Sequence, residues 1–138
     1  MESRNSNQYI ISKPQIPSSN KAPTSKNKKP YDLEERTANF GEQIIDFVQK
    51  MPKTVITIPL ISQLIRAATS VGANYLEADA SSTKKDFRFK ISLCRKEAKE
   101  TRHWLRMMVK AVPASQESAR ELWQEAQELT FIFSSILK

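Results

Sequence analysis

The chain has 138 residues, 39% of them hydrophobic, with a formal net charge of +7 and a single cysteine. This length fits one domain, and one cysteine excludes an internal disulfide framework. No stretch approaches the roughly 18 apolar residues of a membrane span, and the N-terminus lacks the hydrophobic core of a signal peptide. We therefore expect one cytoplasmic protein without membrane association.

Residues 1–30 contain four prolines, six Lys or Arg and one Glu, and they are rich in Ser and Asn. Such a segment buries too little apolar surface to offset the entropy lost on ordering, so we predict a disordered basic tail. Its Lys26, Lys28 and Lys29 are typical of a basic arm for nucleic acid, and equally of a solubilising tail. The folded domain is predicted over 31–138.

The first helix is predicted to begin near Asp32, with Glu35 three residues later, and Pro52 ends it. Its apolar face recurs every three or four residues, at Leu33, Thr37, Phe40, Ile44, Phe47 and Met51. Residues 51–58 have no partner strand in the sequence, so we predict a loop that packs over one end of the bundle. Pro59 suits the first turn of the next helix.

Two long helices follow, joined by the short polar segment 81–83, which allows only an antiparallel return. Thr83 and Asp86 have the spacing of a capping box. The core positions of the first helix of the pair are Thr57, Ile61, Leu64, Ala68, Val71, Tyr75 and Ala78. Those of the second are Phe87, Ile91, Cys94, Ala98, Thr101, Leu105, Met108 and Val112. Cys94 is thus interpreted as a small buried residue rather than a reactive thiol.

Residues 113–115 interrupt the chain, and a fourth helix is predicted from the stripe Ala119, Leu122, Ala126, Leu129, Phe133 and Ile136. Four helices with short or moderate links predict an all-α, antiparallel, up-down-up-down four-helix bundle. The two glycines, Gly41 and Gly72, both lie inside helices, where glycine costs about 1 kcal/mol relative to alanine. We predict that another helix approaches closely at these positions.

Positive charge is concentrated on the third helix, where residues 84–110 contain ten Lys or Arg against three acidic residues. Six of these cations form a narrow stripe beside the core positions: Arg88, Arg95, Lys99, Arg102, Arg106 and Lys110. Such a stripe can follow a phosphate backbone irrespective of base sequence. The alternative is a solvated face near the acidic residues of the first and fourth helices.

A further face of the second and third helices carries small, aromatic and charged residues together. It consists of Arg66, Ser70, Ala73, Asn74, Glu77, Phe89, Leu93, Glu97, Glu100 and Trp104, which we call the assembly face. Exposed aromatic side chains of this kind are typical of interfaces. We predict that it binds a second copy of the chain, while a solvated face with incidental charges is the alternative.

Catalytic and metal-binding patterns are lacking. Glu100 and His103 have the E-x-x-H spacing of di-iron bundles, but such a site needs two such pairs and two further glutamates, and His103 is the only histidine. Two isolated glycines cannot form a phosphate-binding loop, and no nucleophile-histidine pairing is favoured. We expect no catalytic residues, no metal and no cofactor.

The runs YDLEERTANF and QLIRAATSVGANYLEADASSTKKDFRFKISLCRKEAKETRHWLR resemble a bacterial four-helix-bundle family named after proteins encoded in 23S rRNA intervening sequences. The resemblance covers 31 to about 137 and is carried by Arg66, 70–74, Glu77, 85–87, 95–98 and 104–105. It implies an antiparallel bundle that assembles as a homopentamer, without established enzymatic activity. A related group comprises accessory proteins of diversity-generating retroelements, which are associated with nucleic acid and a reverse transcriptase. His103 stands where an aromatic residue such as Tyr is usual.

Together these patterns predict a non-catalytic, oligomeric bundle that binds RNA or DNA through the basic stripe. The alternative is a protein-interaction scaffold, or an accessory subunit of a nucleoprotein or reverse-transcriptase complex. In both cases the chain would act through surfaces, with a nucleic acid or another protein as its partner.

Overall fold

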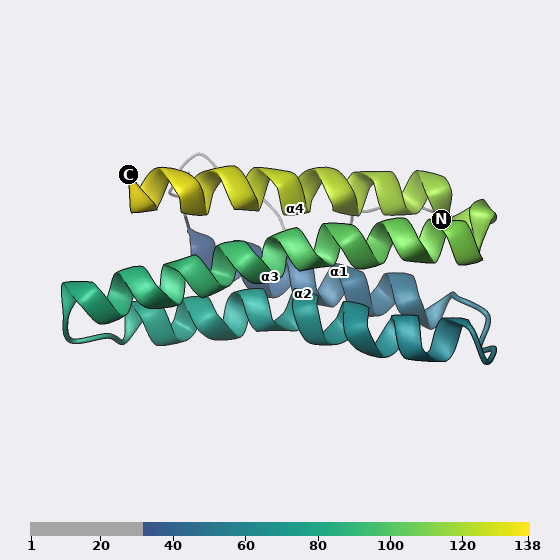
Figure 1. Ribbon diagram of the computed structural model, residues 1–138, viewed down its shortest axis with the longest axis horizontal. Helices are drawn as coiled ribbons and strands as arrows, with labels where there is room; N and C mark the ends of the chain where they lie inside the picture. The colour runs from purple at the N-terminus through teal and green to yellow at the C-terminus, as the bar shows by residue number, and fades with distance from the viewer. Residues whose placement is uncertain (1–31) are drawn as a thin grey trace. The chain divides into compact units, whose positions relative to one another are not determined.

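The computed structural model describes residues 32–138, which contain four α-helices and one short 3-10 helix and no strand. The helices are α1 (Leu33–Gln49), α2 (Thr57–Asp79), α3 (Lys84–Ala111) and α4 (Gln116–Leu137), with the 3-10 helix η1 at Pro113–Ser115. Successive helices run antiparallel, and α3 lies between α2 and α4 (Figure 1). The predicted all-α four-helix bundle is confirmed. The tail predicted at 1–30 lies outside the described residues.

The predicted apolar stripes form the core. On α3, six of the eight predicted core positions are buried, and the two at its ends, Phe87 and Val112, are half-buried. Buried threonines satisfy their hydroxyls locally: Thr37 donates to the Leu33 carbonyl at 2.7 Å and Thr101 to the Glu97 carbonyl at 2.8 Å. Because buried hydroxyls without partners are costly, these bonds let threonine occupy core positions.

The turn between α2 and α3 is closed by the predicted cap. The Thr83 hydroxyl accepts a hydrogen bond from the Asp86 backbone N–H at 3.0 Å, and Thr83 itself has an extended backbone. This bond satisfies one of the free amides at the start of α3, and Asp86 adds negative charge to the first turn. The long α3 therefore starts at a defined residue and returns along α2.

The loop between α1 and α2 differs from the prediction. Met51 joins the core, but Val55 and Ile56 do not cover the end of the bundle, since they are 88% and 63% exposed. The reason is a pair of reciprocal bonds in which Thr54 N–H donates to the Thr57 hydroxyl at 2.9 Å and Thr57 N–H donates to the Thr54 hydroxyl at 3.1 Å. These bonds tighten the turn and leave the two residues between them at its apex.

Both glycines lie where α1 and α2 approach each other. A Cβ added at Gly72 would lie 3.2 Å from Thr37 Oγ1, which is tighter than ordinary contact, and 3.5 Å from the Thr37 backbone carbonyl carbon. A Cβ at Gly41 would lie 3.6 Å from Thr69 Cγ2, an ordinary van der Waals distance. The predicted close approach therefore excludes a larger side chain at Gly72, whereas the space at Gly41 accepts a methyl group.

This difference gives a stability prediction. Gly41→Ala should raise the free energy of unfolding by about 0.5–1 kcal/mol, because it removes the helix cost of glycine without a clash. Gly72→Leu should lower it by about 1–3 kcal/mol through overpacking against α1. Urea unfolding followed by circular dichroism measures both. Equal stabilisation by the two substitutions would contradict the close approach at Gly72.

Candidate nucleic-acid interface

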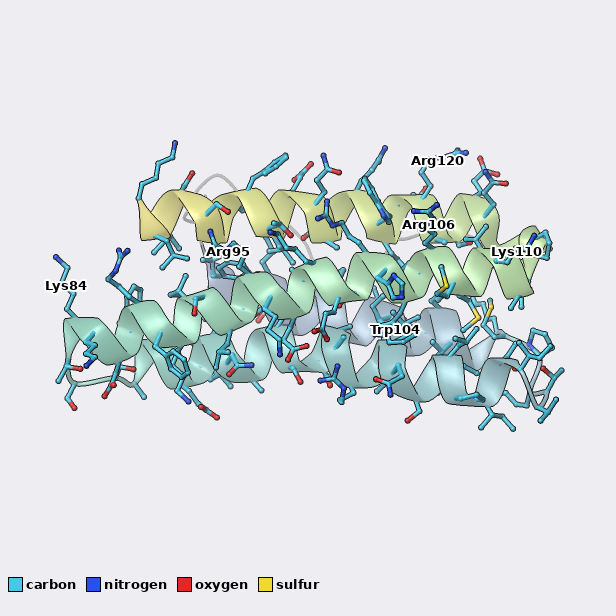
Figure 2. The ribbon with its side chains drawn as sticks, in the orientation of Figure 1. Lys84, Arg95, Trp104, Arg106, Lys110 and Arg120 are labelled. Carbon is cyan, nitrogen blue, oxygen red and sulfur yellow. The ribbon has the colours of Figure 1, made fainter. Side chains whose placement is uncertain are left out.

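The predicted basic stripe lies along the junction of α3 and α4, which we call the seam. Arg88 donates to the Leu137 carbonyl at 2.7 Å, and Arg95 donates to the Ser134 hydroxyl at 3.3 Å. The guanidinium of Arg102 lies 5.3 Å from the ring centroid of Trp123. Figure 2 shows Arg95 and Arg106 on the side of α3 that faces α4, with Lys110 at the C-terminal end of α3. The helix thus aligns all six cations along one edge.

None of these six cations forms a salt bridge within residues 32–138. Three of them make neutral contacts with α4, as described above, and the remaining three, Lys99, Arg106 and Lys110, are exposed. Other cations of the same region do have carboxylate partners, including Arg36, Arg66 and Lys90. Cations elsewhere, such as Lys50 and Lys53, also lack a salt bridge among the described residues. The stripe is set apart because its six cations without carboxylate partners are aligned on one side of a single helix.

Two acidic residues of α4, Glu125 and Glu128, turn away from the stripe, towards α1. Arg36 binds Glu125 through two hydrogen bonds of 2.8 Å and Glu128 through one of 2.7 Å. The hydrogen bonds that Arg36 donates to Glu125 raise the pKa of Arg36 above its usual range; burial opposes this rise, and the charge of Glu125 adds to it. Glu121 lies one turn before Glu125 and shares that side of α4. The carboxylates of Glu121, Glu125 and Glu128 therefore lie on the side of α4 towards α1, where they do not neutralise the seam.

One row of residues along α4 borders the seam and contains no acidic side chain. Its residues recur every three or four positions: Arg120, Trp123, Gln127, Phe131, Ser134 and Lys138. Figure 2 places Arg120 on α4 near the level of Arg106. The sequence-based prediction did not include Arg120, Trp123, Phe131 or Lys138, although their spacing on one side of the fourth helix was the available signal. The seam is a two-helix surface.

A shallow, open groove occupies the end of the seam near the C-terminus of α4. Its lining consists of Lys85, Arg88, Phe89, Ser92, Arg95, Ser134, Leu137 and Lys138. Four of these eight residues are cations, and Phe89 is 57% exposed. Phe89 was assigned to the assembly face from the sequence, and the structure also brings it to the edge of the cationic surface.

The predicted assembly-face residues gather on the opposite flank of α3, beside α2, where Figure 2 shows Trp104. Several of the polar groups are paired within the chain: Arg66 contacts Glu97 at 3.5 Å and Glu100 at 3.0 Å, and Lys90 contacts Glu77 at 2.6 Å. Glu97 is only 7% exposed. Ala73, Glu77 and Phe89 are exposed, while Ser70, Asn74, Leu93 and Trp104 are half-buried.

Within residues 32–138 no group of three or more His, Cys, Asp or Glu side chains is placed to hold a metal ion. Cys94 is 0% exposed, and burial raises the pKa of its thiol to about 12. Its thiolate is therefore strongly disfavoured near neutral pH. His103 is exposed, and its ring packs edge-on against Trp104 with centroids 4.8 Å apart. Among the described helices, none combines the length and apolar character that crossing a membrane requires.

The fold and this surface define a four-helix-bundle protein whose most distinctive exposed chemistry is a cationic seam. The family described as 23S rRNA-intervening sequence protein matches residues 30–135, and the chain belongs to this family. A crystal structure of a protein of unknown function from the S23 ribosomal protein family of Bacteroides thetaiotaomicron VPI-5482 has the same fold. It is 26% identical, with a TM-score of 0.68, over 77% of this chain and 98% of that chain. Comparison with curated proteins gives no match.

The buried Glu97 gives a prediction for the assembly face. Arg66→Met leaves the Glu97 carboxylate with Lys96, 4.0 Å away, as its one remaining cation. This substitution should lower the free energy of unfolding by about 1–3 kcal/mol. Adding Glu97→Leu should recover most of this loss, because no buried charge then lacks its partner. As a control, Lys90→Met removes a more exposed ion pair and should cost less than about 1 kcal/mol. Urea unfolding at matched protein concentrations checks all three variants.

Proposed function

We propose that this protein binds the phosphate backbone of RNA or DNA, without catalysis, through the seam of α3 and α4. The observation that carries the proposal is that six aligned cations have no carboxylate partner among the described residues. If these cations served only to stabilise the fold, they could form salt bridges with nearby glutamates at little cost. A polyanion supplies the missing negative charge and releases its own counterions on binding.

The dimensions of the seam support a linear ligand. Arg88 and Lys110 are 22 residues apart, which is about 33 Å along a helix. Arg120 and Lys138 on α4 add positive charge near the two ends of this stretch. A single small anion would use only one or two of these cations, whereas a nucleic-acid strand presents a phosphate at each nucleotide.

The proposal includes self-association through the assembly face, as the family resemblance implies for a pentamer. Support comes from the exposed Ala73, which lets a neighbouring helix approach, and from Phe89, which is 57% exposed. The seam lies on the other flank of α3. Copies joined through the assembly face would present several seams to one strand, which strengthens a weak contact through effective concentration.

A scaffold that binds another protein is the second candidate, and a separate observation favours it. Val55, Ile56 and Ile58 are 88%, 63% and 56% exposed at one end of the bundle, and clustered exposed aliphatic side chains are typical of protein contacts. Purification of the tagged protein with and without nuclease separates the two functions. Loss of the co-purified material on nuclease treatment supports the seam, and a protein retained after it supports the scaffold.

The first test removes charge from the seam without touching its packing. Replacing Lys99, Arg106 and Lys110 with Gln should weaken binding to an oligonucleotide. It should also make the negative slope of log affinity against log salt shallower by about 2. All three side chains are exposed and lack a salt-bridge partner in the described chain, so helicity should not change. Fluorescence anisotropy across a salt series measures the slope.

A matched control removes the same charge from other surfaces. Replacing Lys50, Lys90 and Lys96 with Gln also lowers the net charge by three, but none of these residues belongs to the seam. If binding depends only on overall charge, the two triple variants will lose affinity equally, and the seam is then not the binding surface. Retained affinity and slope in the control, with loss in the seam variant, supports the proposal.

The second test concerns assembly. Size-exclusion chromatography with light scattering should give a particle mass of about five times the 15.8 kDa mass of one chain. Ala73→Arg should reduce it to the monomer, because the added side chain extends from an exposed position into the space of the neighbour. Ala38→Arg makes the same change at an exposed position of α1 and should leave the mass unaltered. A wild-type monomer would refute the proposed assembly.

A further inference from the structure

Two aromatic side chains on α4 accompany the cations of the seam. Trp123 is 37% exposed and Phe131 is 60% exposed, although both are large enough to stabilise a core if buried. Phe131 follows Trp123 by eight residues and precedes Ser134 by three, so it shares their side of α4. The contacts of Trp123 with Arg102 and of Ser134 with Arg95 place that side beside the stripe.

The rings lie at intervals along the seam rather than in one cluster. Eight residues of helix separate Trp123 from Phe131 by about 12 Å. Because α3 and α4 are antiparallel, the contacts of Arg95 and Arg102 with α4 bracket the level of Phe131. At the groove, Phe89 adds a third exposed ring beside Arg88 and Lys85. Cations and rings therefore alternate along one surface.

We infer that the ligand of the seam is a single-stranded nucleic acid, whose bases stack on Trp123 and Phe131 while its phosphates contact α3. This inference rests on the proposed function and specifies its ligand. In a duplex the faces of the bases are covered by their neighbours, and cations alone suffice to bind its backbone. In a single strand the faces are free, and exposed rings beside a cationic track bind them without regard to sequence.

Arg102 strengthens the platform at Trp123. Its guanidinium lies 5.3 Å from the ring centroid, within the range of a cation–π contact. The arginine thereby limits the motion of the ring and also offers its own planar group to a base or a phosphate. Side-chain entropy lost on binding is smaller for a ring that is already held in place.

The experiment compares an oligo(dT) strand of roughly 16 nucleotides, the upper end of single-strand sites on one domain, with the same strand annealed to oligo(dA). The single strand should bind more tightly to the full chain. Phe131→Leu and Trp123→Leu keep apolar side chains but remove the rings, and each should weaken single-strand binding at least about fivefold while changing duplex binding less than about twofold. Leu76→Ala removes a comparably exposed apolar side chain from α2 and should change neither affinity.

A spectroscopic measurement gives a second readout. Trp104→Phe leaves Trp123 as the sole tryptophan, and its fluorescence should be quenched by the single strand but not by the duplex. Equal affinities for strand and duplex, with no effect of the leucine variants and no selective quenching, would overturn the inference while leaving the proposed function intact. Absence of salt-dependent binding to either probe would instead overturn the proposed function itself.

Discussion

The antiparallel return of α3 along α2 is the constraint on which the surfaces depend. The short turn ending at Thr83 brings α3 back along α2, and α3 is the longest helix, at 28 residues. Its core stripe must then face inward along its whole length, which leaves two flanks. The flank beside α2 holds the ion pairs of Arg66, Glu97 and Glu100, and the flank beside α4 holds the unpaired cations. The fold separates these two kinds of chemistry on one helix.

The bundle also separates the charges of α4. Arg36 on α1 binds Glu125 and Glu128, so these carboxylates stabilise the contact between the first and last helices. They are consequently turned away from the seam. Like charges on the seam repel one another, by about 1 kcal/mol for a pair 4 Å apart in water and less when salt screens them. A bound polyanion relieves this repulsion, so the same arrangement that costs some stability in the free protein favours the proposed ligand.

Most of the fold could be predicted from the sequence because one rule, apolar residues every three or four positions, determines the buried side of each helix. The same rule does not show which residues of neighbouring helices lie side by side. It identified the stripe of Arg95 and Arg102 but did not show that Trp123 and Ser134 lie beside it, since the order and handedness of the helices decide which flanks meet. It placed Glu97 on the assembly face but did not show that Arg66 of the same chain forms a salt bridge with it. At Val55 and Ile56, the reciprocal bonds of Thr54 and Thr57 outweighed the tendency of aliphatic residues to be buried.

The two surfaces of α3 have consequences for each other. In the proposed assembly, contacts through the α2 side leave the α4 side of each copy open, so self-association and nucleic-acid binding do not compete for Lys99 or Arg106. Phe89 is the exception, because it lies on the predicted assembly face and also lines the groove at the end of the seam. A neighbour that covers Phe89 would close that end of the groove, whereas Trp123 and Phe131 lie on α4, away from the assembly face. Within an oligomer, stacking would therefore depend on the two α4 rings, and the cations between them would determine its response to salt.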